Sequence, residues 1–283
     1  MSEPVSFADI QSRALNQVAR SEVSVSAREI QLLLMAAAGL DKATLIARER
    51  DSCPAPVIKI FDRYMARRLQ HEPVYRILGR REFHGLDLAL NEATLEPRDD
   101  TECLVEASLR QISNLHSSLR ILDLGTGTGA VALALLSELP NAVCVAVDIQ
   151  QRALEVAFAN ARKHNLHTRF ETLLGNWFDG VEGTFDIIVS NPPYISSSTV
   201  QKLDEEVRLF DPPVALDGGV DGLDAYRVVL GEARSYLDAG GFMGLEIGHD
   251  QKASVSQLAA KLGWSEISSF ADLAGLDRAL ILR

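Results

Sequence analysis

The chain has 283 residues, of which 47% are hydrophobic and 24% charged, and its formal net charge at pH 7 is −11. Its length and composition indicate a globular protein with one large domain or two smaller ones. The negative charge argues against broad, nonspecific binding to nucleic acid, which needs clustered Lys and Arg side chains to displace counterions from the phosphate backbone. We therefore expect no direct nucleic-acid binding.

Neither the cysteines nor the first residues indicate export or a membrane anchor. The three cysteines, Cys53, Cys103 and Cys144, have no CxxC or Cys/His ligand spacing, so the sequence supports neither a disulfide framework nor a metal site. The N-terminus lacks a basic start followed by an apolar segment, and the best apolar stretch, Leu32–Leu40, is too short to span a bilayer. We expect a cytoplasmic protein.

Residues 1–71 show the patterns of a small helical domain. Ser26-x-x-Glu29 is a capping-box pattern, apolar residues follow it at helical spacing from Ile30, and Gly39 ends the segment. A further helix is predicted from about Pro56 onward, through apolar and aromatic residues.

The pattern changes over residues 72–98, where short apolar and alternating runs surround Gly79 and Gly85. This change predicts a β-hairpin, which we interpret as the linker between two domains. After the hairpin, Asp99-Asp100 supplies negative charge that favours the N-terminus of a helix.

Residues 99–283 alternate between strand-like and helix-like segments. Such alternation predicts an α/β domain, whose mostly parallel sheet has helices on both faces. The segments are Arg120–Leu124, Ala130–Leu139, Ala142–Asp148, Gln151–His164, Arg169–Leu174, Phe185–Ser190, Asp224–Leu237, Gly241–Ile247, Lys252–Leu262 and Ala279–Leu282.

The first strand of this domain enters a glycine-rich turn, Gly125-Thr126-Gly127-Thr128-Gly129, which precedes a predicted helix. Glycines at such a turn let the backbone approach a ligand closely. Asp148 ends the next predicted strand, about 20 residues after the turn, where an acid accepts hydrogen bonds from ribose hydroxyls. The sequence therefore predicts a nucleotide-type cofactor site.

Two cofactors compete for this loop. A dinucleotide could place its pyrophosphate on the helix N-terminus by using Gly125-x-Gly127-x-x-Ala130. Asp123, directly before the glycines, would repel a pyrophosphate, whereas it would attract the cationic amino-acid end of S-adenosylmethionine. The charge favours S-adenosylmethionine, and an NAD-dependent oxidoreductase remains the alternative.

Asn191-Pro192-Pro193-Tyr194 directly follows the apolar run Phe185–Ser190. Ligands of open α/β sheets bind at the carboxyl ends of the strands, which is where this tetrapeptide is expected. The Asn191 side-chain oxygen and a neighbouring carbonyl could accept both hydrogens of a planar NH2 group while the Tyr194 ring stacks on it. The alternative is a strand-terminating turn, since Asn-Pro and Pro-Pro commonly mark turns.

Two further segments have both a functional and a structural interpretation. Trp177, after the third predicted strand, could cover an adenine ring with Asn176 at its edge, or it could pack in the core. Asp211-Pro212-Pro213 repeats part of the tetrapeptide but lacks the aromatic residue and a preceding apolar strand, so we interpret it as a loop.

These motifs, in this order, resemble those of class I S-adenosylmethionine-dependent methyltransferases that modify planar nitrogens. More narrowly, the chain resembles the release factor glutamine methyltransferase (HemK/PrmC) family over nearly its whole length. The resemblance also rests on the helical N-terminal region and on Glu72-Pro73-Val74, Gly79-x-Arg81-Glu82-Phe83, Thr101-Glu102, Trp177-Phe178, Asp221-Gly222-Leu223-Asp224-Ala225-Tyr226 and Asp272-Leu273-Ala274-Gly275-x-Asp277-Arg278.

The resemblance implies a seven-stranded methyltransferase domain over residues 99–283 and a substrate-recognition domain over residues 1–71. It implies methyl transfer from S-adenosylmethionine to the glutamine side-chain nitrogen (N5) in the Gly-Gly-Gln loop of peptide release factors, by a protein expected to be a monomer. Residues implied to bind the cofactor are Asp123, Gly125, Thr126, Gly127, Thr128, Gly129, Asp148, Trp177 and Asn191. The implied substrate site is Asn191, Pro192, Pro193 and Tyr194, of which Asn191, Pro192 and Tyr194 are the implied catalytic residues.

Two positions depart from the family pattern. Asp99 stands where the family usually has proline, and Asn176 replaces the usual acid before Trp177, which weakens one expected contact to adenine. Ribosomal-protein glutamine methylation and adenine N6 methylation of nucleic acid remain alternatives. The latter predicts an added recognition region and a basic groove.

Overall fold

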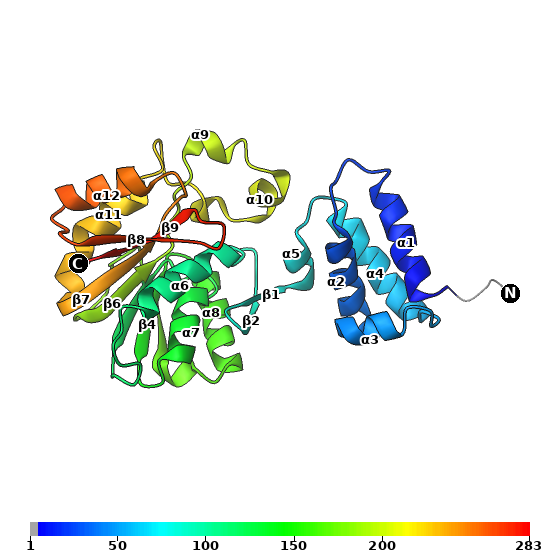
Figure 1. The fold of residues 1–283 in the computed structure, drawn as a ribbon, viewed down its shortest axis with the longest axis horizontal. Helices are drawn as coiled ribbons and strands as arrows, with labels where there is room; N and C mark the ends of the chain where they lie inside the picture. Colours follow the sequence, from blue (N-terminus) through cyan, green and yellow to red (C-terminus); the bar gives the residue numbers. More distant parts are fainter. Residues whose placement is uncertain (1–4) are drawn as a thin grey trace. The chain divides into compact units, whose positions relative to one another are not determined.

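The computed structural model describes residues 5–283, which divide into two compact units, one ending at Gly79 and the other running from Arg80 to Arg283. Figure 1 shows a helical first unit and a second unit built on a central sheet. The division falls inside residues 72–98, the range that the sequence assigned to a hairpin linker. The two units are therefore described separately.

The first unit is a set of short helices around its own apolar core, as the sequence predicted. Ser26 and Glu29 form the predicted capping box, and Gly39 ends that helix in the left-handed conformation with φ of +62°. The core includes Phe7, Leu33 and Phe61, all nearly inaccessible to solvent. The helices are α1 (Phe7–Val18), α2 (Ala27–Ala38), α3 (Lys42–Ala47), α4 (Ala55–Arg68) and α5 (Val74–Leu78).

The range 72–98 contains three different structures rather than a single hairpin. Helix α5 belongs to the first unit, and the hairpin of β1 (Arg80–Phe83) and β2 (Leu86–Ala89) begins the second. Its turn, His84-Gly85, has positive φ at both residues, a conformation typical of tight hairpins. An irregular segment then leads to the helical turn η1 (Asp99–Thr101).

A seven-stranded sheet with the order β5-β4-β3-β6-β7-β9-β8 forms the centre of the second unit. Every pairing among the first five strands of that order is parallel, and β9 runs antiparallel to both of its neighbours. This confirms the predicted α/β class and mostly parallel sheet. The strands are β3 (Arg120–Leu124), β4 (Val143–Asp148), β5 (Phe170–Leu174), β6 (Phe185–Ser190), β7 (Leu237–Glu246), β8 (Ile267–Ala271) and β9 (Asp277–Leu282).

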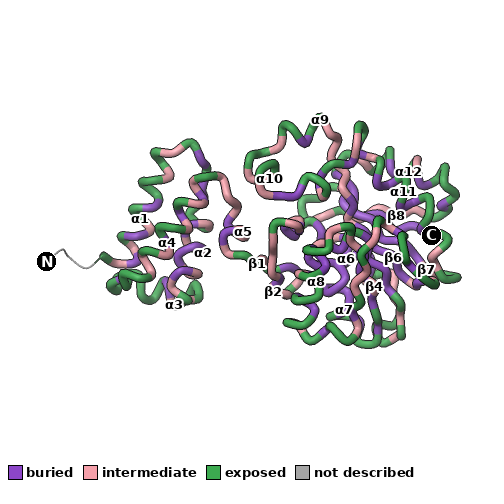
Figure 2. Tube along the Cα trace, turned by 180° about the vertical axis from the view of Figure 1, so that it is seen from behind, coloured by how far each residue is buried: buried purple, intermediate pink, exposed green. Residues whose placement is uncertain are grey.

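Helices cover both faces of the sheet and enclose two apolar clusters. One cluster joins the sheet to α6 (Glu102–Leu109), α7 (Ala130–Glu138) and α8 (Gln151–Lys163), and the other joins it to α11 (Asp224–Glu232) and α12 (Lys252–Lys261). Figure 2 shows the central strands buried between these layers. The short helices α9 (Ser197–Val200) and α10 (Glu205–Phe210) and the turns η2 (His167–Arg169), η3 (Pro213–Ala215) and η4 (Ala233–Tyr236) complete the unit.

Within residues 5–283, the structure contains no helix that is both long enough and apolar enough to cross a membrane.

Candidate active site

A cavity of about 360 Å³ lies at the carboxyl ends of the central strands in the second unit. Chain order changes direction between β3 and β6, so this is the switch point at which open α/β sheets bind ligands. Several predicted site residues line it: Asp123, Gly125, Thr126, Gly127, Thr128, Asp148, Trp177, Asn191 and Pro193. Gly129, Pro192 and Tyr194 are predicted site residues that do not line this cavity.

The glycines of the loop after β3 have different structural roles. Gly125, Gly127 and Gly129 all have positive φ, which disfavours any side chain there. A Cβ atom on Gly127 would meet nothing within 4 Å, whereas one on Gly129 would lie 3.3 Å from Ala157 of α8. The first two glycines therefore open the cavity to a ligand, and Gly129 allows close packing of helices.

Asp148, at the end of β4, is bound to the backbone on both carboxylate oxygens. Oδ2 accepts a hydrogen bond of 2.9 Å from the Gly127 N–H, and Oδ1 accepts one of 2.9 Å from the Gln150 N–H. Burial raises the pKa of Asp148, and these backbone donors oppose the rise. Because each oxygen has a second lone pair, the carboxylate remains able to accept hydrogen bonds from a ligand.

Asp123 is a buried carboxyl at the wall of the same cavity, with 2% of its surface exposed. Its Oδ2 accepts a hydrogen bond of 2.7 Å from the Thr126 hydroxyl. Burial raises its pKa to about 7, and the negative charge of Asp148 adds to the rise. A cationic group entering the cavity would offset both effects.

Trp177 lines the cavity and also packs against the edge of an apolar core cluster, so it shows features of both interpretations. It is half-buried, has a positive φ of 56°, and its ring lies 3.8 Å from where a Cβ atom of Gly125 would stand. Positive φ is uncommon for a bulky residue and concentrates at functional sites. The next residue, Phe178, is the one that packs in the core, where its ring stacks on Tyr236 at 4.7 Å.

The tetrapeptide after β6 presents its residues to different surroundings. Asn191 and Pro193 line the cavity, and Pro192 is buried. The Asn191 Nδ2 donates a hydrogen bond of 3.2 Å to the Thr101 hydroxyl, whereas the Tyr194 hydroxyl donates one of 3.4 Å to Glu246. The side-chain oxygen Oδ1 of Asn191 is thus the end of the amide left for a ligand.

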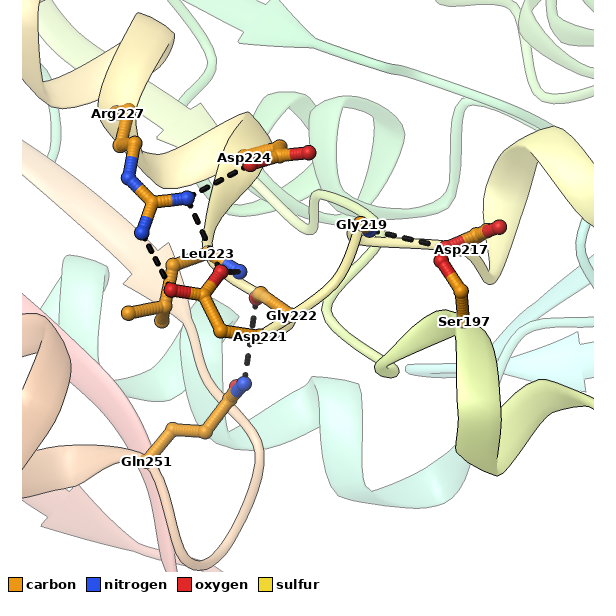
Figure 3. A network of polar contacts seen from close by, with 9 residues as sticks. All are labelled: Ser197, Asp217, Gly219, Asp221, Gly222, Leu223, Asp224, Arg227 and Gln251. Atoms are coloured by element: carbon orange, nitrogen blue, oxygen red, sulfur yellow. Dashed lines mark hydrogen bonds and ion pairs between the residues drawn. The ribbon is translucent and has the colours of Figure 1, made fainter.

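A loop of residues 216–224 packs directly on the tetrapeptide, where a Cβ atom on Gly218 would lie 2.8 Å from the Pro193 oxygen. Figure 3 shows this loop with Gln251 beside Gly222. Gln251 donates hydrogen bonds from Nε2 to the carbonyl oxygens of Tyr194 at 3.0 Å and Gly222 at 3.3 Å, which joins the two segments. The approach requires glycine, since a Cβ atom on Gly222 would lie 2.4 Å from the Tyr194 oxygen. Asp217 stabilises the loop by accepting hydrogen bonds from Ser197 and Gly219.

Sequence reasoning missed one wall of the cavity. Arg98 and Thr101 line it before the sheet begins, and several residues after the second Pro-Pro pair line it from the other side. Asp211 and Pro212 lie in a loop, as predicted, whereas Pro213 begins the helical turn η3, and residues after it line the cavity. These residues are Val214, Ala215, Asp217, Asp224, Ala225 and Val228.

The structure shows the contacts of Asp99 and the position of Asn176, the two residues that depart from the family pattern. Asp99 accepts a hydrogen bond of 2.6 Å from Arg81, so the position usually taken by proline holds an ion pair. The neighbouring Asp100 pairs with Arg278 at 3.1 Å. Asn176 is exposed and lines the cavity beside Trp177. Among residues 5–283, no three His, Cys, Asp or Glu side chains gather in a way that could hold a metal ion.

The chain matches two protein families along its length. The family described as the methyltransferase small domain matches residues 101–208, and the PrmC N-terminal domain matches residues 9–79. The fold also resembles solved methyltransferases. One from Pyrococcus furiosus has a TM-score of 0.51, with 23% identity over 78% of this chain and 98% of that one. The sheet and these matches define an α/β methyltransferase.

Relatives of known name define the family of this chain more narrowly. A release factor glutamine methyltransferase of Agrobacterium fabrum is 51% identical over 220 residues, which is 77% of this chain and 76% of the relative. One from Bradyrhizobium diazoefficiens is 40% identical over 290 residues, covering 100% of this chain and 97% of the relative. The chain belongs to the release factor glutamine methyltransferase family.

Proposed function

We propose that this protein transfers a methyl group from S-adenosylmethionine to the side-chain nitrogen N5 of the glutamine in the Gly-Gly-Gln loop of peptide release factors. The observation that carries the proposal is that Asn191 and Pro193 line the same cavity as the glycine loop and Asp148. The amide acceptor and the nucleotide-type site therefore belong to one cavity. Membership of the family supplies the identity of the protein substrate.

The lining residues fit S-adenosylmethionine in charge and shape. Asp123 is a buried carboxyl whose pKa is raised mainly by burial, and the amino group of the cofactor would supply a cation that favours its ionised form. Asp148 would hold the ribose hydroxyls and Trp177 would lie against the adenine. When bound, the cofactor supplies an electrophilic methyl carbon on a sulfonium centre.

The tetrapeptide would bind and orient the substrate amide. The Asn191 Oδ1 accepts one amide hydrogen and a proline carbonyl accepts the other, so the nitrogen is held in the cavity in a fixed direction. An amide nitrogen is a weak nucleophile because its lone pair is delocalised into the carbonyl. The two acceptors bind its N–H groups more strongly as positive charge develops on nitrogen, which stabilises the transition state more than the ground state.

Direct binding to nucleic acid is not part of this proposal, and neither is an oligomer. Two arginines of the arginine-rich stretch between Arg63 and Arg81 are paired with carboxylates: Arg67 with Glu72, and Arg81 with both Glu96 and Asp99. We expect a monomer that recognises a protein loop.

The test is mass spectrometry of purified release factor after incubation with the protein and S-adenosylmethionine. A methyl-sized mass increase is expected on the Gly-Gly-Gln peptide, and none on a release factor whose glutamine is replaced by glutamate. Ribosomal proteins and an adenine-containing oligonucleotide serve as competing substrates. Methylation of either of these, without methylation of the release factor, would refute the proposal.

A further inference from the structure

Helix α8 carries a buried side-chain amide that contacts two other segments of the second unit. This residue, Asn160, is 1% exposed. Its Oδ1 accepts a hydrogen bond of 2.8 Å from the Ala89 N–H, and its Nδ2 donates to the Ala89 oxygen at 3.2 Å and to the Thr128 oxygen at 3.0 Å. A buried polar group without such partners is costly. The amide therefore joins the end of β2 to the glycine-rich loop.

These contacts fix the direction of the Asn160 amide. Its nitrogen has two hydrogens to donate, and each of them has a backbone carbonyl to bind. A rotated amide would place its oxygen against the Ala89 and Thr128 carbonyls, acceptor against acceptor, and its NH2 against the Ala89 N–H. Both ends of the side chain are thus held by main-chain atoms.

The two segments that Asn160 contacts lead to the cavity. Thr128 lines it directly, and the irregular segment after β2 lines it through residues such as Leu95. The loop is close to α8 at a second point, because a Cβ atom on Gly129 would lie 3.3 Å from Ala157. Ala157 is three residues before Asn160, so the two share one face of the helix. That face of α8 sets the distance between the glycine loop and the chain that leaves β2.

From these contacts we infer that Asn160 is a positioning residue for the cofactor, which holds the Thr128 carbonyl and keeps the glycine loop in the conformation that receives the ligand. Asn160 itself does not line the cavity. The inference deepens the proposed function and rests on it, because it takes the glycine loop to bind S-adenosylmethionine. A loop held in advance does not have to be ordered by the ligand, which favours binding.

Asn160→Leu tests this role, because it keeps the approximate size of the side chain and removes all three hydrogen bonds. We expect the dissociation constant of S-adenosylmethionine, measured by calorimetry, to rise about 10- to 100-fold, the range for leaving a buried polar group without its partner. Asn160→Ala leaves room for water to replace part of the lost bonds, so it should cause a smaller rise. If Asn160→Leu does not fold, as judged by circular dichroism, Asn160→Ala decides the question.

Arg169→Met is the matched control, because Arg169 binds backbone carbonyls at the other end of α7. Its guanidinium donates to the oxygens of Leu136, Leu139 and Ala142 at 2.8 to 2.9 Å, and it does not line the cavity. Its loss should lower the free energy of unfolding and leave the affinity for the cofactor unchanged. A loss of affinity as large as that of Asn160→Leu would reflect lost stability in general and overturn the positioning role.

Hydrogen exchange of the ligand-free protein separates this inference from the proposed function. Amides of the loop are held by bonds such as that from the Gly129 N–H to the Thr126 oxygen, at 2.8 Å. Peptides covering residues 125–129 should exchange about tenfold faster in Asn160→Leu than in the wild type or in Arg169→Met, with Asn160→Ala between them.

Two results overturn the positioning role of Asn160. One is wild-type exchange of the loop in both Asn160 variants, and the other is wild-type affinity for S-adenosylmethionine in both. Failure of the wild-type protein to bind S-adenosylmethionine or to methylate release factor overturns the proposed function, while the exchange experiment still tests whether Asn160 holds the loop.

Discussion

At the scale of single residues, the most informative contrast is between the two ends of the Asn191 amide. Nδ2 donates a hydrogen bond to Thr101, whereas Oδ1 has no hydrogen-bond partner among the described residues, and Asn191 lines the cavity. The protein therefore holds one end of the Asn191 amide, and the other end can accept a hydrogen bond from a ligand. The same division between internal and ligand-facing groups applies to Asp123, which is bound to Thr126 at the cavity wall.

Asn191→Ala should reduce methyl transfer to release factor by about 100-fold or more, since it removes an acceptor that is stronger in the transition state. Binding of S-adenosylmethionine, measured by calorimetry, should change far less, because the glycine loop and Asp148 remain. Wild-type turnover with normal cofactor binding would show that the tetrapeptide does not hold the substrate amide.

Asp123→Asn should weaken the binding of S-adenosylmethionine by roughly tenfold to a hundredfold, the range for losing a hydrogen bond to a charged group. The neutral amide keeps the size of the side chain and can still accept a hydrogen bond from Thr126. Calorimetric titration at neutral pH measures the change, with S-adenosylhomocysteine, which has the same amino-acid end, as a second ligand. An unaltered affinity for both would place the amino group elsewhere.

The residues of this site differ in how far the sequence could predict them. The glycine loop and Asp148 could be placed because spacing and strand pattern fix them locally, and the structure brings them to one cavity with Asn191. Trp177 could not be assigned, because its direction depends on a positive φ that no local pattern shows. Gly129, which the resemblance implies binds the cofactor, does not line the cavity, and an added Cβ atom there would lie 3.3 Å from Ala157.

At the scale of elements, the wall that sequence reasoning missed is made by backbone contacts. Residues 216–224 form main-chain hydrogen bonds with the residues that directly follow the tetrapeptide, such as that from the Gly218 N–H to the Ile195 oxygen, at 2.8 Å. Main-chain hydrogen bonds do not depend on particular side chains. In the sequence, only the glycines of residues 216–224 indicated that this loop approaches another segment closely. The capping box of α2 and the order of strands and helices, in contrast, depend on local periodicity and were predicted correctly.

Gly222→Ala should destabilise the protein by about 2 kcal/mol or more and lower its activity. The added Cβ would stand 2.4 Å from the Tyr194 oxygen, and the residue has a positive φ of 73°, so both sterics and backbone conformation oppose the change. Urea denaturation gives the free energy of unfolding, and release-factor methylation gives the activity.

Gly231→Ala is the matched control for this substitution. Gly231 lies within helix α11, has ordinary φ, and would meet nothing within 4 Å of an added Cβ. Alanine should there raise the free energy of unfolding by about 0.5–1 kcal/mol, because it is the better helix former. Equal effects of the two substitutions would mean that the contact between Gly222 and the tetrapeptide is not under steric constraint.

At the scale of the whole molecule, each unit has its own apolar core, and every residue that lines the cavity belongs to the second unit. A fragment of residues 80–283 should therefore bind S-adenosylmethionine with nearly the affinity of the full chain. Its methylation of release factor should be weaker, if residues 1–71 recognise the substrate as the family resemblance implies. Calorimetry and the methylation assay measure the two quantities. Loss of cofactor binding by a folded fragment would contradict the assignment of the site to one unit.

The ligand-free protein should become less stable as pH rises toward neutrality. Burial raises the pKa of Asp123 and of Glu246 to about 7, from ordinary values of 3.8 and 4.5. Between the ordinary and raised values the folded protein retains protons that the unfolded chain has released, so the free energy of unfolding falls with rising pH. Each of the two carboxyls ionises in the folded state only near pH 7, and above that pH its contribution to the fall in the free energy of unfolding is complete.

The double variant Asp123→Asn, Glu246→Gln isolates this effect, because neither amide titrates. Between about pH 5 and pH 7 the wild-type protein should lose at least about 2 kcal/mol more of its free energy of unfolding than the variant does. Urea denaturation at each pH measures both proteins, and other titrating groups cancel in the comparison. S-adenosylmethionine should reduce the difference, since its amino group favours the ionised form of Asp123 and lowers that pKa. Parallel pH profiles for the two proteins would show that these carboxyls do not retain protons on folding.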